Sequence, residues 1–274
     1  MQAGQCGGGA GLASVKAEVD HDGREDKCRL ARFQAGGQVL QGELLADGQL
    51  RDRAGASYDP LEVIWLPPAQ PSKVIGLALN YAEHAAELDI QAPPDPALFF
   101  KPLSALIGHL APVIYPAGVE YLHYEVELAV VIGQRCRKVV AERAESIIAG
   151  YTIANDVTVR DFVGNFYRPP VRAKGYDSFG PVGPALISPD EVPHPDRLEL
   201  RAFVNGELRQ RGNTADMLRS VPELIEFISG FMTLEPGDMI WTGTPKGISH
   251  VRPGDVMRLE IDGLGALENP VVAE

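Results

Sequence analysis

Short apolar runs that end near glycine or proline limit the folds open to this chain more than any other feature. Such runs occupy residues 74–79, 126–132, 151–154 and 257–261 of a chain with 29 glycines and 22 prolines. Each run has the length of a buried strand and is too short for a typical buried helix. The glycines and prolines between the runs are typical of turns. The pattern predicts a mostly β protein with a few helices, in the α+β class.

Two segments have helical patterns instead. Ser220 and Glu223 have the spacing of a capping box, and Pro222 falls in the first turn, where its missing N–H costs little. Apolar residues then recur along one face, which we expect to pack on the core. These residues are Leu224, Ile225, Ile228, Phe231 and Met232. A second, shorter helix is expected at residues 81–88.

The beginning of the chain differs in composition from the rest. Residues 1–27 are rich in glycine, small and charged residues without a sustained period, which predicts an irregular leader. Residues 28–70 contain short alternating segments broken by glycines and are expected to form a small N-terminal β domain. The proline-rich stretch 66–71 suits neither a helix nor a central strand, so the domain junction is placed there. Residues 71–274 are then expected to form the main domain.

Charge and cysteine content exclude several classes of function. With 37 acidic and 25 basic residues, the formal net charge of -12 opposes binding to nucleic acid or an anionic membrane. Cys6, Cys28 and Cys136 lie far apart and predict neither a disulfide framework nor a zinc cluster. No apolar run approaches the roughly 20 residues that a membrane span needs. We therefore expect a cytoplasmic protein that binds neither nucleic acid nor membrane.

Three carboxylates near the ends of expected strands predict a metal site. Glu125 and Glu127 alternate on one face of a strand, and Asp156 follows another apolar run. A Glu-x-Glu pair alone is more often a solvated face. A third acid favours a hard cation such as Mg²⁺, Mn²⁺ or Ca²⁺, because oxygen ligands suit these ions better than zinc. Three protein ligands leave about three of six octahedral positions for a chelating 2-oxo carboxylate and a water.

Several motifs occur in order between residue 74 and the C-terminus. They are Asn80-Tyr81-x-x-His84-x-x-Glu87, His123-x-Glu125-x-Glu127, Asn155-Asp156, Arg160-Asp161, Lys174, Val204-Asn205-Gly206-Glu207 and Gly243-Thr244-Pro245-Lys246-Gly247. In this order they resemble the fumarylacetoacetate hydrolase superfamily, which makes residues 71–274 the expected catalytic domain. The resemblance implies a mixed β-sandwich roll with a small N-terminal β domain. Within the family, 78–81, 120–125 and 165–169 look most like the homoprotocatechuate-pathway decarboxylases and isomerases. Ala78 and Leu79 stand where many acylpyruvate hydrolases of the family have Gly-Arg.

The resemblance also implies roles for individual residues. Glu125, Glu127 and Asp156 correspond to ligands of one Mg²⁺ or Mn²⁺ ion, which polarises the substrate carbonyl and stabilises an enolate. His84 and Glu87 share a helix face and correspond to a lid dyad that moves protons or orients water.

Lys174 corresponds to a catalytic lysine that adds positive charge near the substrate oxygen, although a solvated lysine is the ordinary alternative. Tyr81, Arg168, Arg172 and Thr244 are candidates for substrate carboxylate binding. Surface salt bridges and an ordinary turn are the alternatives for these residues.

The function implied is a metal-dependent decarboxylase or isomerase. Its substrate would be a 2-oxo or 2-hydroxy-dienoic di- or tricarboxylate from aromatic catabolism. One alternative is a C–C hydrolase of the same superfamily that acts on an acylpyruvate or fumarylpyruvate, and another is a non-catalytic metal-binding module. A homodimer is expected by the same resemblance.

Overall fold

Strands make up most of the structure, as the pattern of short apolar runs predicts. The computed structural model describes residues 29–91, 93–163 and 169–274, so the predicted leader 1–27 lies outside the described residues. Cys6 and Cys28 also lie outside them, and Cys136 is a free cysteine. The α-helices in this part of the chain are α1 Ala82–Glu87, α2 Val171–Lys174 and α3 Val221–Phe231. The expectation of a mostly β fold with a few helices is confirmed.

The strands are distributed along the whole described chain. They are β1 Arg29–Ala35, β2 Gln38–Leu44, β3 Leu50–Asp52, β4 Ser57–Tyr58, β5 Ile64–Leu66, β6 Val74–Ala78, β7 Ala97–Lys101, β8 Leu106–Ile107, β9 Val113–Tyr115, β10 Leu122–His123, β11 Val126–Ile132, β12 Ile148–Asn155, β13 Thr158–Val159, β14 Gly180–Ile187, β15 Glu199–Val204, β16 Glu207–Asn213, β17 Met239–Trp241, β18 His250–Val251, β19 Val256–Ile261 and β20 Gly265–Ala273.

The largest sheet contains the strands that carry the predicted ligands. Its main path runs β4-β3-β2-β1-β14-β12-β11-β17-β6-β7, with β5 beside β1 and β8 beside β14. β11 and β12 pair antiparallel, with Val126 opposite Asn155. Every residue of β11 is buried, which explains its nearly continuous apolar sequence. The central strands therefore hold the candidate ligands on a rigid support.

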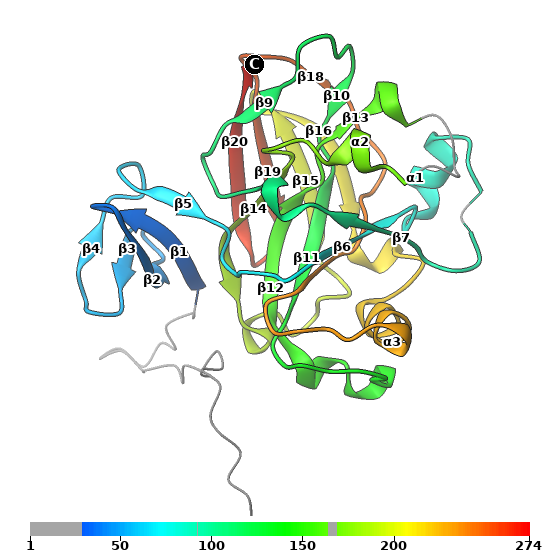
Figure 1. Ribbon diagram of the computed structural model, residues 1–274, viewed down its shortest axis with the longest axis horizontal. Helices are drawn as coiled ribbons and strands as arrows, with labels where there is room; N and C mark the ends of the chain where they lie inside the picture. The colour runs from blue at the N-terminus through cyan, green and yellow to red at the C-terminus, as the bar shows by residue number, and fades with distance from the viewer. Residues whose placement is uncertain (1–28, 92, 164–168) are drawn as a thin grey trace, which may run out of the picture.

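A second, five-stranded sheet in the order β16-β15-β19-β20-β9 completes the sandwich. The main hydrophobic cluster joins the two sheets, with Val130 and Ile153 from the large sheet and Leu200 and Leu259 from the smaller one. Figure 1 shows these strands stacked in the body of the molecule, with α3 below and α1 to one side. A short sheet in the order β13-β10-β18 lies beside them. This arrangement confirms the expected sandwich architecture.

Strands β1 to β4 form a lobe at one side of the body (Figure 1). The lobe has its own apolar cluster that includes Phe33, Leu50 and Trp65. Strand β1 also pairs with β14, with Arg29 opposite Ile187, so the large sheet continues into the lobe. The domain boundaries at 28–70 and 71–274 stay a prediction.

The helices follow the sequence patterns in part. Ser220 caps α3 and its backbone N–H donates to Glu223 at 2.7 Å, which confirms the capping box. Phe231, however, is 53% exposed, so the expectation that it packs on the core is wrong. Its ring lies edge-on to that of Phe227, which is also exposed, with 5.8 Å between the ring centroids, so Phe231 lies on the solvent side of the last turn of α3. Helix α2 was not predicted, because four residues are too few to display a period. No helix among the described residues is long and apolar enough to cross a membrane.

Candidate metal centre and active site

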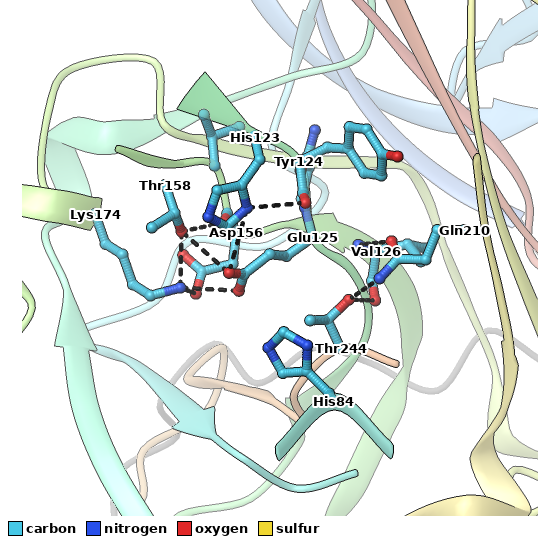
Figure 2. A network of polar contacts seen from close by, with 12 residues as sticks. His84, His123, Tyr124, Glu125, Val126, Asp156, Thr158, Lys174, Gln210 and Thr244 are labelled. Atoms are coloured by element: carbon cyan, nitrogen blue, oxygen red, sulfur yellow. Dashed lines mark hydrogen bonds and ion pairs between the residues drawn. The ribbon is translucent and has the colours of Figure 1, made fainter. Parts of the chain in front are cut away.

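Three carboxylates from neighbouring strands converge at one place, and Figure 2 shows two of them, Glu125 and Asp156, close to each other. Glu125 immediately precedes β11, Glu127 lies within it, and Asp156 follows β12. Because β11 and β12 are paired, the two strand ends bring these residues together. Oxygen atoms of the three side chains lie within 4.8 Å of one another, and all three residues are buried. The structure thus brings together the three carboxylates that the sequence predicts as metal ligands.

The electrostatics of this cluster fit a cation. Burial raises the pKa of Glu127, and the charges of Asp156 and Glu125 raise it further. Burial also acts to raise the pKa of Glu125, but Lys174 and nearby histidines outweigh it and hold that pKa at about 2. The Oε1 atom of Glu127 is buried without a hydrogen-bond partner among the described residues. A buried carboxylate oxygen left without a donor is the atom that a divalent cation would coordinate.

Lys174 is the last residue of α2, and its side chain lies beside Glu125 and Asp156 (Figure 2). Its Nζ donates to Glu125 Oε2 at 2.8 Å, to Thr158 Oγ1 at 2.8 Å, and to Asp156. Burial lowers the pKa of Lys174, but the carboxylates raise it more, so the pKa lies above its ordinary value. The side chain is therefore a cation at neutral pH. The sequence motif includes this lysine, and the structure places it in contact with Glu125 and Asp156.

A second buried lysine, Lys101 at the end of β7, was not predicted as a site residue. Its Nζ donates to Asp156 Oδ1 at 2.6 Å and to Val157 O at 3.3 Å. Burial lowers the pKa of Lys101, and Asp156 opposes that effect. The available signal was a lysine that ends the apolar run 97–101, where a charged residue on a buried strand needs a partner.

His123 belongs to a predicted motif but was not predicted as a site residue. Its side chain is fully buried beside Glu125, with 3.6 Å between His123 Nδ1 and Glu125 Oε1. Burial lowers the pKa of His123 to about 4, so the imidazole is neutral at physiological pH. Its Nε2 has no hydrogen-bond partner among the described residues.

The predicted dyad forms on helix α1. His84 Nδ1 lies 3.0 Å from Glu87 Oε2, and His84 is buried. Glu87 Oε1 accepts a hydrogen bond from Gly247 N at 3.0 Å. Figure 2 shows the His84 ring facing the same space as Glu125. The helix is thus fixed at one end to the turn at residues 243–247.

That turn contacts the ligand strand directly. Gly243 N donates to Glu127 Oε2 at 2.8 Å, and Gly243 has a φ of +88°, which favours glycine. Thr244 Oγ1 donates to Val126 O at 2.9 Å and accepts from Gln210 at 2.8 Å. Both uses of the Thr244 hydroxyl are internal. Its predicted role in substrate binding therefore stays a prediction.

The remaining predicted binding residues are Tyr81, Arg172 and Arg168. Tyr81 is buried, its hydroxyl has no hydrogen-bond partner among the described residues, and burial together with Glu127 raises its pKa. The Arg172 guanidinium lies over the ring of Phe162, 3.8 Å from its centroid. Arg168 falls outside the described residues.

Comparisons with known proteins identify a matching family and similar enzymes. Residues 73–272 match the family model for the fumarylacetoacetate (FAA) hydrolase C-terminal domain. The 4-hydroxyphenylacetate degradation bifunctional isomerase/decarboxylase of Salmonella dublin is 49% identical over 208 residues, which cover 76% of this chain. The chain spans only 48% of that relative's length.

Two solved structures are also similar. The 5-carboxymethyl-2-hydroxymuconate delta-isomerase from Mycobacterium smegmatis has 40% identity and a TM-score of 0.80, with 90% of this chain and 99% of that chain covered. The maleylpyruvate hydrolase from Sphingobium sp. SYK-6, in complex with manganese(II) and pyruvate, has 32% identity and a TM-score of 0.76. Coverage there is 89% of this chain and 99% of that chain.

Proposed function

Since this chain belongs to the fumarylacetoacetate hydrolase family, we propose that it is a divalent-metal-dependent decarboxylase and isomerase. Its substrate is a 2-oxo or 2-hydroxy-dienoic di- or tricarboxylate from aromatic catabolism. The observation that carries this proposal is the buried triad of Glu125, Glu127 and Asp156, which lies beside two buried lysines. The similarity to an isomerase/decarboxylase and to a delta-isomerase supports the reaction class.

The triad would hold one Mg²⁺ or Mn²⁺ ion. Oxygen-only ligands and the raised pKa of Glu127 both favour a hard cation at this place. The bound ion would supply Lewis acidity toward the 2-oxo carboxylate group of the substrate.

Lys174 and Lys101 would stabilise negative charge beside the triad. During decarboxylation the bond to the departing carboxylate carbon breaks, CO₂ leaves, and the electron pair moves toward the 2-oxo oxygen. Lys174 is a cation at neutral pH and lies within hydrogen-bonding distance of two of the proposed ligands, so its positive charge would stabilise the negative charge that develops on that oxygen. Removal of water from this buried place strengthens the interaction.

The dyad on α1 would move protons. Glu87 can accept a proton from one substrate carbon and return it to another, because His84 bonds to one of its oxygens and Gly247 N holds the other. After CO₂ leaves, the carbon that lost it needs one proton, which protonated Glu87 would donate and then regain from solvent. Tyr81 and Thr244, with Arg168 and Arg172, are proposed to contact the substrate carboxylates.

A C–C hydrolase is the second candidate. The similarity to a maleylpyruvate hydrolase that binds manganese(II) and pyruvate favours it. In that reaction the same dyad would orient and deprotonate a water molecule instead of moving a proton between carbons.

Product analysis separates the two candidates. The full chain, stripped with chelator and reloaded with Mg²⁺ or Mn²⁺, is given 5-oxopent-3-ene-1,2,5-tricarboxylate and, separately, an acylpyruvate. The tricarboxylate is expected to yield CO₂ or an isomer, which is followed by ultraviolet absorbance. This product should be lost in the presence of chelator and in Glu125→Ala. Glu226→Gln is the control, because Glu226 is exposed on α3, which carries none of the proposed site residues. Two carboxylic fragments from the acylpyruvate alone would replace this proposal with the hydrolase.

We also propose that the enzyme is a homodimer and acts in the cytoplasm. Light scattering of the purified chain tests the first part, since the mass of one chain would refute it. Fractionation of the source cells tests the second.

A further inference from the structure

Gln210 of β16 reaches across from the five-stranded sheet to the strand that carries two of the proposed ligands. Its side chain is almost fully buried, at 1% exposure. The amide oxygen accepts from Val126 N at 3.2 Å. The amide nitrogen donates to Thr244 Oγ1 at 2.8 Å and to Pro245 O at 2.6 Å. One side chain therefore bonds at once to the ligand strand and to the turn at 243–247.

Gln210 bonds to the backbone of Val126, the residue between Glu125 and Glu127. Strand β17 ends at Trp241, opposite Ala129, so Val126 lies beyond the end of that neighbouring strand. Gln210 accepts from the Val126 N–H, and Thr244 donates to the Val126 carbonyl at 2.9 Å. These two side chains take the place of a strand neighbour for this edge of β11. The backbone between Glu125 and Glu127 is thereby held in extended form, which keeps both carboxylates on one face.

The 243–247 turn, to which Gln210 bonds, also contacts helix α1. Gly243 N donates to Glu127, and Gly247 N donates to Glu87 of α1. Strand β16 packs closely on this turn, because a Cβ at Gly212 would lie 2.4 Å from the Pro245 Cβ. The position of the turn relative to β16 is therefore tightly fixed.

We propose that Gln210 is a positioning residue for the metal centre. It fixes Val126 and the 243–247 turn in one relative position, so that Glu125 and Glu127 point into the same space and Glu87 docks beside them. It touches neither the ligands' oxygens nor the reacting atoms. This inference rests on the proposed metal centre.

The test measures cation affinity apart from catalysis. Free Mn²⁺ is titrated by its electron paramagnetic resonance signal against the full chain and against Gln210→Met, which keeps the length but removes the three hydrogen bonds. Gln210→Glu is a second variant that keeps an acceptor for Val126 N and removes the donor. Thr244→Val and the double variant Gln210→Met/Thr244→Val complete a cycle. Glu207→Gln is the matched control, because Glu207 lies on the same strand and is exposed.

Loss of an outer support of this kind typically weakens metal affinity about 10- to 100-fold. We expect that loss in Gln210→Met and Gln210→Glu, with unchanged affinity in Glu207→Gln. The double variant should lose much less than the product of the two single losses, because Gln210 and Thr244 act as one unit. In the assay above, kcat should fall more than KM rises.

Some results would overturn the inference. Mn²⁺ affinity within twofold of the parent in either folded Gln210 variant, or losses that multiply in the cycle, would show that Gln210 has only a packing role. Circular dichroism identifies which variants are folded, and Gln210→Glu decides the case if Gln210→Met is not. A parent chain that binds no Mn²⁺ would overturn the metal centre itself. A parent that binds Mn²⁺, with variants unchanged, would overturn only the role of Gln210.

Discussion

Replacement of Lys174 by methionine tests the charge balance of the active site. The Lys174 ammonium contacts Glu125 and Asp156, and both carboxylates are buried. Asp156 keeps its contact with Lys101, but Glu125 loses its lysine partner. Removal of one partner of a buried ion pair costs about 3–5 kcal/mol, because the remaining charge is left unpaired. For a chain of this size about 2–4 °C of Tm corresponds to each kcal/mol, so the metal-free variant should melt about 6–20 °C lower.

A bound divalent cation should reverse most of this loss. The cation places positive charge beside the same carboxylates, so Mn²⁺ should at least halve the difference in Tm between Lys174→Met and the parent. Calorimetry in chelator and in saturating Mn²⁺ measures both differences. Burial lowers the pKa of Lys174, but the neighbouring carboxylates raise it more. Lys174 is therefore charged at pH 7.5, where the comparison is made. Its stabilisation is fully present below the unfolded pKa of about 10.4 and is lost only as pH rises through the higher folded value.

Arg172→Met is the matched control on the same helix. It loses a cation–π contact with Phe162, worth about 1 kcal/mol, and its Tm should not respond to Mn²⁺ differently from the parent. Equal losses for Lys174→Met with and without Mn²⁺ would refute the argument that the lysine and the cation neutralise the same carboxylates. If metal-free Lys174→Met were as stable as the metal-free parent, the predicted cost of losing the buried ion pair would be refuted.

Three further predictions concern other residues. Glu87→Gln should lower kcat about 10²- to 10⁴-fold while Mn²⁺ affinity measured by titration stays unchanged, and a parallel loss of affinity would contradict the proton-transfer role. Burial and Arg258 lower the pKa of His109 to about 4, so the folded state loses up to about 3 kcal/mol of stability as pH falls from 6.5 to 4. Denaturant unfolding of His109→Asn should show a flatter dependence over that range, and an unchanged slope would exclude His109 as its source. Lys101→Met removes the 2.6 Å contact to Asp156 and should lower kcat by about 10²-fold in steady-state assays, whereas an active variant would limit Lys101 to a packing role.

The sequence by itself determined the strands at the centre of the fold and the chemistry of the triad. The run 126–132 forms β11 as predicted, because an apolar stretch of that length is read from local composition alone. Ser220 and Glu223 likewise predict the start of α3, because a capping box involves residues that are only three apart. Alternation along one strand put Glu125 and Glu127 on a shared face.

Only the tertiary structure decided which distant residues complete the site. Lys101 contacts Asp156 from 55 residues away, and Gln210 contacts Val126 from 84 residues away. Neither contact has a local signal, because it depends on which strands neighbour each other and on how the second sheet packs on the first. The exposure of Phe231 was missed for the same reason, since helical period identifies an apolar face but not where that face leaves the core. Residue chemistry thus follows from the sequence, whereas the pairing of charges across the sandwich follows from packing.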